Sequence, residues 1–285
     1  VEVASEYRYR KTVLMDDTLV VTISQSGETA DTLAALRAVK LRTDLTLSIC
    51  NVPESSLVRE SALILMTRAG PEIGVASTKA FTTELLSLLM LVTALARRHG
   101  LADDEMRSLF HQAQNLPALI DVVLQNNAAI DQWAEEFTDL ENAIFIGRGT
   151  LFPIALEGAL KLKEISYIHA DAYPAGELKH GPIALIDQEL PTIAVASVDG
   201  YEGKIKSNIQ EILARGGKVY LFADERMDVS DLGEDCHVMK VPAVDAVLAP
   251  VLFCIPLQLF SYYVAVRKGT DVDQPRNLAK SVTVE

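Results

Sequence analysis

Blocks of hydrophobic residues alternate with polar turns along this chain. Residues 19–23 form an apolar run rich in β-branched side chains, and the run stops at the polar stretch 24–29, which reads Ser-Gln-Ser-Gly-Glu-Thr. Over residues 30–40, apolar side chains recur about one helical turn apart, with acidic residues near the start and basic residues near the end. The pattern predicts a buried strand, a short turn and a helix whose charges suit its dipole.

The same alternation continues after this first helix. Two short apolar runs, at residues 45–50 and 62–66, predict two further buried strands, and residues 77–99 predict a long helix. We also expect a short strand at residues 1–3. Strands that alternate with helices indicate a parallel sheet.

The second half of the chain repeats this pattern. Apolar runs at residues 192–197, 218–224 and 237–241 correspond to the three predicted strands, and in both halves a long apolar helix follows that ends in basic residues and a glycine. The repeat indicates two copies of one α/β unit. The second copy also begins with a strand and helix within residues 143–166, so we expect the first copy to lack these opening elements.

The predicted fold is therefore α/β, with two modules that each contain a doubly wound parallel sheet flanked by helices. Residues between the two copies are acidic and helical in pattern, and the residues after the second copy are polar. We expect a first module at residues 1–101, a helical connector at 102–140, a second module at 141–269 and a tail at 270–285.

Composition limits the classes of function. The net charge of −13, without a cluster of Lys and Arg, argues against a nucleic-acid surface, which needs a basic stripe. The apolar stretch 247–266 is interrupted by two prolines and a glutamine, which favours a buried helix over a membrane span. Cys50, Cys236 and Cys254 are widely spaced in or beside apolar runs, as expected for free thiols in a reducing compartment. We expect a cytoplasmic protein with no metal and no cofactor.

The turn at residues 24–29 is the first candidate for chemistry. Its hydroxyls and glycine lie between a strand and a helix N-terminus, where backbone N–H groups and O–H donors can surround a phosphate. An ordinary turn with a Ser or Thr cap is the alternative.

Charged residues on a later helix are the second candidate. Glu157, Lys161 and Glu164 are spaced four and three residues apart, so they share one helix face. They form either a surface ladder or a carboxylate and an ammonium that face a cleft and act in proton transfer.

A loop and the tail complete the candidates. Residues 175–182 crowd Glu, Lys and His between glycines and a proline, which is typical of a solvated loop or of a functional one. Lys280 lies in the polar tail, where it is either solvated or able to form an imine with a ketone.

Four stretches, taken together, resemble the isomerase half of the glutamine–fructose-6-phosphate aminotransferase family, also called glucosamine-6-phosphate synthases. They are residues 24–29, 72–79, 177–182 and 271–285, and the likeness spans essentially the whole chain. That half of the family consists of two sugar isomerase (SIS) modules, in agreement with the internal repeat.

The resemblance implies a role for each candidate. Lys280 corresponds to the lysine that forms the imine, Glu164 to the base that moves a proton between C1 and C2, and Lys161 to its charged neighbour. His180 corresponds to the ring-opening histidine, which acts from the adjacent subunit and so implies a homodimer. The remaining matched residues hold the phosphate or lie near the sugar: Ser24, Gln25, Ser26, Thr29, Val75, Ser77 and Ala279.

The implied reaction converts fructose 6-phosphate and ammonia to glucosamine 6-phosphate, in the synthesis of amino sugars such as UDP-N-acetylglucosamine. The glutaminase domain of the family has no match in this chain, so we expect ketose–aldose isomerisation at most without supplied ammonia. Two alternatives stay open: a regulatory module that senses a sugar phosphate, and a fructosamine-phosphate deglycase.

Overall fold

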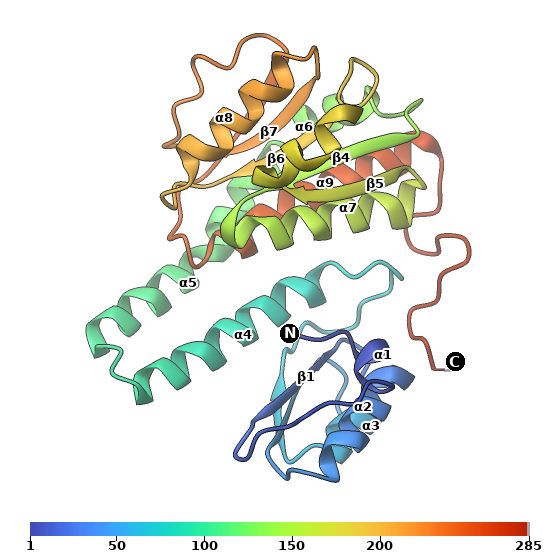
Figure 1. Ribbon diagram of the computed structural model, residues 1–285, viewed down its shortest axis with the longest axis vertical. Helices are drawn as coiled ribbons and strands as arrows, with labels where there is room; N and C mark the ends of the chain where they lie inside the picture. The colour runs from blue at the N-terminus through green and yellow to red at the C-terminus, as the bar shows by residue number, and fades with distance from the viewer. Residues whose placement is uncertain (284–285) are drawn as a thin grey trace. The chain divides into compact units, whose positions relative to one another are not determined.

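The computed structural model describes residues 1–283 and divides into two compact units (Figure 1). Unit 1 consists of Val1–Leu101 and the chain end from Asn277 onwards, and unit 2 consists of Ala102–Arg276. The last two residues of the predicted tail lie outside the described residues.

Unit 1 contains a parallel sheet in the order β1-β2-β3. The central strand is buried along its whole length, which explains its continuous run of small and apolar residues. Residues 1–3 form no strand, in contrast to the prediction: they are exposed, and the Val3 carbonyl accepts the N–H groups of Glu6 and Tyr7 at the start of α1 instead of joining a sheet. The elements are α1 (Ala4–Tyr7), β1 (Val20–Ser24), α2 (Ala30–Lys40), β2 (Thr46–Cys50), α3 (Ser56–Glu60), β3 (Leu63–Met66) and α4 (Lys79–Arg98).

The predicted face of α2 is the one that packs. Leu33, Leu36 and Val39 are buried with Leu57 of α3 in one hydrophobic cluster, and Tyr7 of α1 packs against it. The helical spacing of apolar residues thus covers one face of the sheet and brings the N-terminus of α2 to the end of β1.

Unit 2 contains a five-stranded parallel sheet in the order β5-β4-β6-β7-β8. Its strands β6, β7 and β8 follow one another as β1, β2 and β3 do, in agreement with the predicted repeat, whereas β4 and β5 have no counterpart among the described residues of unit 1. The elements are α5 (Asp103–Gln125), α6 (Asn127–Glu135), β4 (Asn142–Gly147), η1 (Gly149–Leu151), α7 (Phe152–Ser166), β5 (His169–Pro174), η2 (Ala175–His180), η3 (Pro182–Leu185), β6 (Thr192–Ala196), α8 (Glu202–Leu213), β7 (Val219–Asp224), β8 (Cys236–Val241) and α9 (Ala249–Lys268).

Helices cover both faces of this sheet. Helices α7 and α9 pack side by side, and α6 packs on α9, whereas α8 packs on β6 and β7 from the other side (Figure 1). Ile205, Ile209 and Ile212 of α8 are buried in the hydrophobic cluster on that side. The prediction of parallel sheets flanked by helices is confirmed.

The segment expected to connect the modules belongs to unit 2. Its helices α5 and α6 pack against α9. Trp133 contacts the rings of Tyr220 and Phe222, and Phe137 lies edge-to-face with Tyr220 and Phe260. Residues 102–140 therefore build part of the core, because their apolar and aromatic side chains cover a face that the sheet and α9 would otherwise expose to water.

Two helices are long and apolar enough to cross a membrane, judged by length and composition alone. The expectation of a buried helix is confirmed for α9, in which 61% of the most hydrophobic stretch is buried; the corresponding share in α4 is 17%. All three cysteines are free and buried, as predicted. Burial raises the pKa of the Cys236 thiol to about 12.

Candidate functional site

Hydrogen bonds between hydroxyls and backbone amides hold the turn after β1 together. The backbone N–H of Gly27 donates to the Ser24 hydroxyl at 3.0 Å, and that of Glu28 donates to the Ser26 hydroxyl at 3.2 Å. The hydroxyls of Ser24 and Thr29 lie 3.4 Å apart. The turn therefore gathers three hydroxyls at the N-terminus of α2, an arrangement suited to an oxyanion.

Gly27 is required at the centre of this turn for two reasons. Its φ of +67° is in the left-handed region. A Cβ atom added there would also lie 2.1 Å from the Ser55 hydroxyl oxygen and 2.8 Å from the Cys50 sulfur. Ser55 and Cys50, which are buried behind the turn, thus restrict the backbone conformation of the turn that carries the hydroxyls.

Glu28 has a structural contact that connects the turn to α3. Its carboxylate accepts the backbone N–H of Ser56 at 2.7 Å, at the start of α3. That bond, with the Ser56 hydroxyl, holds the pKa of Glu28 below its usual value. The one carboxylate of the turn therefore binds the N-terminus of α3.

The chain end packs onto the turn within unit 1. The Ser281 and Ser26 hydroxyl oxygens lie 3.1 Å apart, and the backbone N–H of Ala30, the first residue of α2, donates to the carbonyl of Val282 at 3.0 Å. Lys280 directly precedes these two contacts in the sequence and belongs to the same unit as the turn. Its neighbour Ala279 is exposed.

Lys280 is held by the segment between β3 and α4. Its Nζ donates to Glu72 Oε2 at 3.0 Å and to the carbonyl of Gly74 at 2.7 Å. This segment also contains Val75 and Ser77, and the Ser77 hydroxyl donates to Glu72 at 2.8 Å. The structure thus brings Lys280, Ser77 and the turn together in unit 1.

Glu72 is a residue that sequence reasoning missed, although it is the first residue of one of the four quoted stretches. Burial favours the neutral acid, but hydrogen bonds from Thr78, Ser77, Lys280 and Ala80 outweigh that effect and hold the pKa of Glu72 below its usual value. Glu72 is therefore a carboxylate at neutral pH.

A cavity of about 680 Å³ lies at the carboxyl end of the unit 1 sheet. Gln25 of the turn, Glu72 and Arg68 contribute to its lining, together with Asn51, Val52, Pro53, Met66, Gly70 and Pro71. Ligands of parallel α/β folds bind at this end of the strands. Arg68 adds a cation to a lining that otherwise carries one negative charge.

The charged face of α7 in unit 2 is buried. Lys161 Nζ lies 2.5 Å from Glu164 Oε2 and 3.5 Å from Glu157 Oε1, and the side chains of Lys161 and Glu157 are at most 10% exposed. Of the two interpretations left open by the sequence, the surface ladder is therefore wrong. An ammonium buried against two carboxylates keeps them in fixed positions.

The loop that contains His180 has a buried half and an exposed half. Ala175 and Leu178 are buried and anchor η2, whereas Lys179 extends outward to Glu211, at 2.8 Å. His180 itself is exposed at the end of η2. Its side chain is thus free to meet a ligand or another protein chain, while its backbone is fixed.

The corresponding turn of unit 2 is filled by its own side chains. Five residues join β6 to α8, as five join β1 to α2. The Asp199 carboxylate accepts the N–H of Tyr201, and the Glu202 carboxylate accepts that of Gly200, at 3.0 and 2.8 Å. The space between these residues and Arg148 is about 10 Å³. In this copy, Asp199 and Glu202 thus take up backbone N–H groups of the turn.

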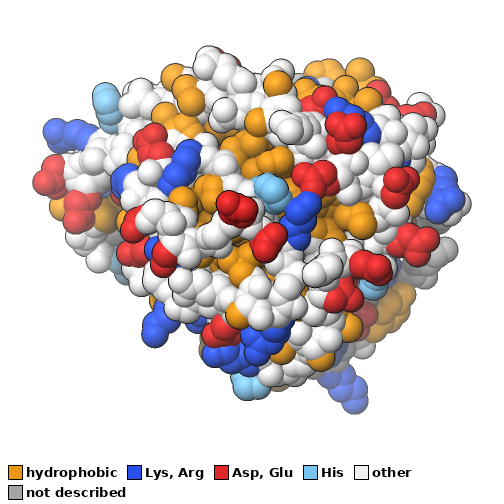
Figure 2. Space-filling view, turned by 90° about the horizontal axis from the view of Figure 1, so that it is seen from above, with side chains coloured by type: hydrophobic (Ala, Val, Ile, Leu, Met, Phe, Trp, Pro, Cys, Tyr) orange, Lys and Arg blue, Asp and Glu red, His pale blue; other side chains and the backbone are white. Residues whose placement is uncertain are grey.

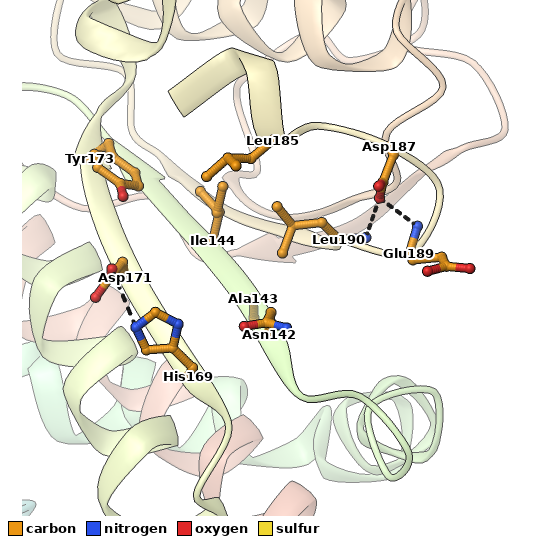
Figure 3. A pocket seen from close by; sticks show the side chains of 10 residues that line it. All are labelled: Asn142, Ala143, Ile144, His169, Asp171, Tyr173, Leu185, Asp187, Glu189 and Leu190. Carbon is orange, nitrogen blue, oxygen red and sulfur yellow. Dashed lines mark hydrogen bonds and ion pairs between the residues drawn. The ribbon is translucent and has the colours of Figure 1, made fainter. Parts of the chain in front are cut away.

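A further cavity in unit 2, of about 360 Å³, lies near the start of β4 and β5 (Figure 3). His169 faces Asp171 at 3.7 Å, and Asp187 accepts the N–H groups of Glu189 and Leu190. Those contacts fold the loop before β6. The ten residues drawn include none of the predicted site residues, and the cavity lies near the amino ends of β4 and β5, not at the carboxyl ends of the unit 2 strands.

Charges of both signs are scattered over the face drawn in Figure 2, around hydrophobic side chains. This distribution is consistent with the argument from net charge, since a nucleic-acid surface gathers Lys and Arg. Among residues 1–283, no group of three or more His, Cys, Asp or Glu side chains is placed to hold a metal ion.

Comparison with known sequences places these features in a family. The sequence pattern of the SIS domain matches residues 1–94 and 136–268, that is, both copies of the repeat. The chain belongs to the SIS domain family. It is 59% identical, over its full length, to an isomerizing glutamine–fructose-6-phosphate aminotransferase of Pseudomonas putida, of which it spans 47%.

Solved structures of SIS proteins have the same fold. The C-terminal domain of glucosamine-fructose-6-phosphate aminotransferase from Francisella tularensis is 52% identical, with a TM-score of 0.93 over 96% of this chain and 77% of that one. A glucosamine-6-phosphate deaminase from Thermotoga maritima is 26% identical, with a TM-score of 0.75 over 98% of this chain and 80% of that one. The SIS chain thus corresponds to the C-terminal isomerase part of the aminotransferases and spans about half of their full length.

Proposed function

We propose that this SIS chain carries out the sugar-isomerase step of a glutamine–fructose-6-phosphate aminotransferase, on fructose 6-phosphate, in the cytoplasm. The observation that carries the proposal is the contact of Lys280 with Glu72 and Gly74, on the same unit as the turn at residues 24–29. The four long matching stretches and the 52–59% identity to aminotransferases support it.

The turn at residues 24–29 receives the phosphate. Ser24, Ser26 and Thr29 offer three hydroxyl donors, and the N-terminus of α2 adds its dipole. In a chain with a net charge of −13, this local cluster of donors supplies the attraction for a dianion. Gln25, in the same turn and in the lining of the cavity, holds the phosphate together with these hydroxyls.

Lys280 reacts with the open-chain ketose. Its neutral Nζ forms a bond to C2 as the carbonyl electron pair moves to oxygen. One proton from Nζ and one from solvent reach that oxygen, and water leaves. The protonated imine that results acidifies the C1 hydrogen, because its C=N bond accepts the electrons released when that proton departs. Val75, Ser77 and Ala279 complete the sugar site.

Ammonia then adds to C2 and displaces the Lys280 amine, which leaves an imine of ammonia at C2 and frees the lysine; Glu164 moves the proton from C1 to C2 of that imine. A carboxylate suits this step when it is kept in one place and partly shielded from water, as the 2.5 Å contact with Lys161 achieves. His180 opens the sugar ring as a proton shuttle near neutral pH. We assign it to the partner subunit's site, which makes the active protein a homodimer.

Borohydride trapping tests the imine directly. The chain is incubated with fructose 6-phosphate, reduced and digested, and the expected result is a stable hexitol phosphate adduct on Lys280. Lys11→Met, which removes an exposed lysine of the same unit, serves as a control and leaves the adduct in place. A folded chain that forms no adduct on Lys280 refutes the imine step.

Mixed dimers test the assignment of His180. His180→Asn and Lys280→Met are each expected to abolish isomerisation, and mixing the two variants restores part of it when one site uses residues from both chains. Absence of recovery in verified mixed dimers contradicts a contribution from the partner.

A regulatory module that only senses the sugar phosphate is the second candidate. It needs the turn but neither Glu164 nor Lys280, so Glu164→Gln separates the two proposals. Retained binding of fructose 6-phosphate with loss of isomerisation supports the enzyme. Identification of the product formed with added ammonia distinguishes an aminotransferase from a fructosamine-phosphate deglycase.

A further inference from the structure

Glu72 is a point at which five hydrogen-bond donors converge. Its Oε1 accepts the backbone N–H groups of Thr78 and Ala80, at 2.8 and 3.3 Å, and the Thr78 hydroxyl at 3.3 Å. Its Oε2 accepts the Ser77 hydroxyl at 2.8 Å and Lys280 Nζ at 3.0 Å. With a side chain only 4% exposed and donors on both oxygens, this carboxylate cannot rotate without losing bonds at the start of α4.

Two acceptors orient Lys280 Nζ. Glu72 Oε2 lies 3.0 Å from it and the Gly74 carbonyl oxygen 2.7 Å from it. A neutral primary amine has two hydrogens and one lone pair in a tetrahedral arrangement. When the two hydrogens point at these two oxygens, the lone pair points to the remaining position, where a carbonyl carbon can approach.

We propose that Glu72 is a positioning residue that orients the Lys280 amine for attack on the substrate carbonyl and stabilises the cationic imine formed. The inference rests on the proposed function and deepens it, since it concerns the same lysine. Glu72 acts through Lys280 and through the fixed backbone at Gly74.

The same carboxylate favours the product of the attack. The protonated imine keeps one hydrogen and a positive charge on Nζ, next to Glu72 Oε2, whereas the neutral amine before the attack has no charge. An oriented negative group therefore stabilises the imine more than the reactant amine. Because hydrogen bonds hold the pKa of Glu72 low, it is a weak base at neutral pH, so the one proton lost from the Lys280 amine goes to the leaving water, and solvent supplies the second proton.

Glu72→Gln disrupts this arrangement without changing the size of the side chain. All five partners of Glu72 are donors, so the amide NH₂ of a glutamine must face a donor in either orientation. With the amide oxygen toward Thr78 and Ala80, the NH₂ group faces Lys280 and donates to the lone pair that should attack. The variant thus removes the charge and the orientation together.

The test measures the rate of borohydride-trapped adduct on Lys280 against the concentration of fructose 6-phosphate. We expect Glu72→Gln to lower the maximal rate at least about tenfold, as misplaced reacting groups do. The half-saturating concentration stays close to that of the unmodified chain, because the hydroxyls of the turn are unchanged. Glu54→Gln, which removes an exposed carboxylate from the same unit, is the control and keeps the full rate.

A folded Glu72→Gln chain that reaches the unmodified maximal rate overturns the inference, as does an effect confined to the half-saturating concentration. If this variant does not fold, Glu72→Asp is tested by the same criteria. Aspartate keeps the negative charge but places it one methylene further from Lys280, so the maximal rate of adduct formation should be intermediate.

A substrate-free measurement separates this inference from the proposed function. Hydrogen exchange at the start of α4 is compared in Glu72→Gln, Lys280→Met and the double variant. Non-additive losses of protection support the pairing of Glu72 with Lys280, and additive losses overturn it. If the unmodified chain forms no adduct but the losses are non-additive, the imine step fails while the pairing of the two side chains holds.

Discussion

Gly27→Ala is the sharpest test of the phosphate turn. The substitution places a Cβ on a residue with φ of +67°, where a non-glycine residue costs about 1–2 kcal/mol. The new atom also lies 2.1 Å from the Ser55 hydroxyl oxygen and 2.8 Å from the Cys50 sulfur, and an overpacked site of this kind costs about 1–3 kcal/mol more. The expected loss is therefore about 2–5 kcal/mol in the stability of unit 1.

Gly70→Ala is a matched control, because Gly70 has φ of +72° and nothing within 4 Å of an added Cβ. It should lose only the backbone part, about 1–2 kcal/mol. The single tryptophan, Trp133, lies in unit 2 and does not report on unit 1. Hydrogen exchange of peptides from β1 and β2 is therefore the assay, with phosphate binding measured in parallel. Equal losses in the two variants would refute the argument that the contacts behind Gly27 shape the turn.

Three further predictions follow from the site and the core. Glu164→Gln should reduce isomerisation by about 10²–10⁴-fold while fructose 6-phosphate still binds, as measured by calorimetry. The pKa values of Glu72 and Asp224 are lowered in the folded chain. The stability that these carboxylates contribute is therefore present at neutral pH and is lost as the pH falls below their ordinary pKa values of 4.5 and 3.8. Acid titration followed by circular dichroism measures this loss. Phe137→Ala should lower the free energy of unfolding of unit 2 by about 3–5 kcal/mol, and denaturation followed by tryptophan fluorescence measures this loss. Phe110 is partly exposed, so Phe110→Ala should lower the free energy of unfolding far less.

The sequence alone was sufficient for most strands and helices, the repeat and the chemical types of the site residues, although residues 1–3 form no strand and β5 was not predicted. The spacing of apolar residues decides which segments become strands or helices, because alternation and helical periodicity are local properties of the backbone. The stretch 24–29 likewise has its hydroxyls within one turn, so it is a candidate phosphate site by sequence alone.

Only the tertiary structure decided how distant residues are used. Glu72 and Lys280 are 208 positions apart, and their contact depends on the chain end returning to unit 1. The spacing of Glu157, Lys161 and Glu164 does not decide whether their helix face is exposed or buried. The packing of unit 2 buries Lys161 and Glu157. Residues 102–140 are helical and acidic by sequence. They form part of the core of unit 2 because their helices pack against α9 and their aromatic residues contact those of β7. Burial and long-range contacts arise from how the whole chain packs, which no local pattern of side chains encodes.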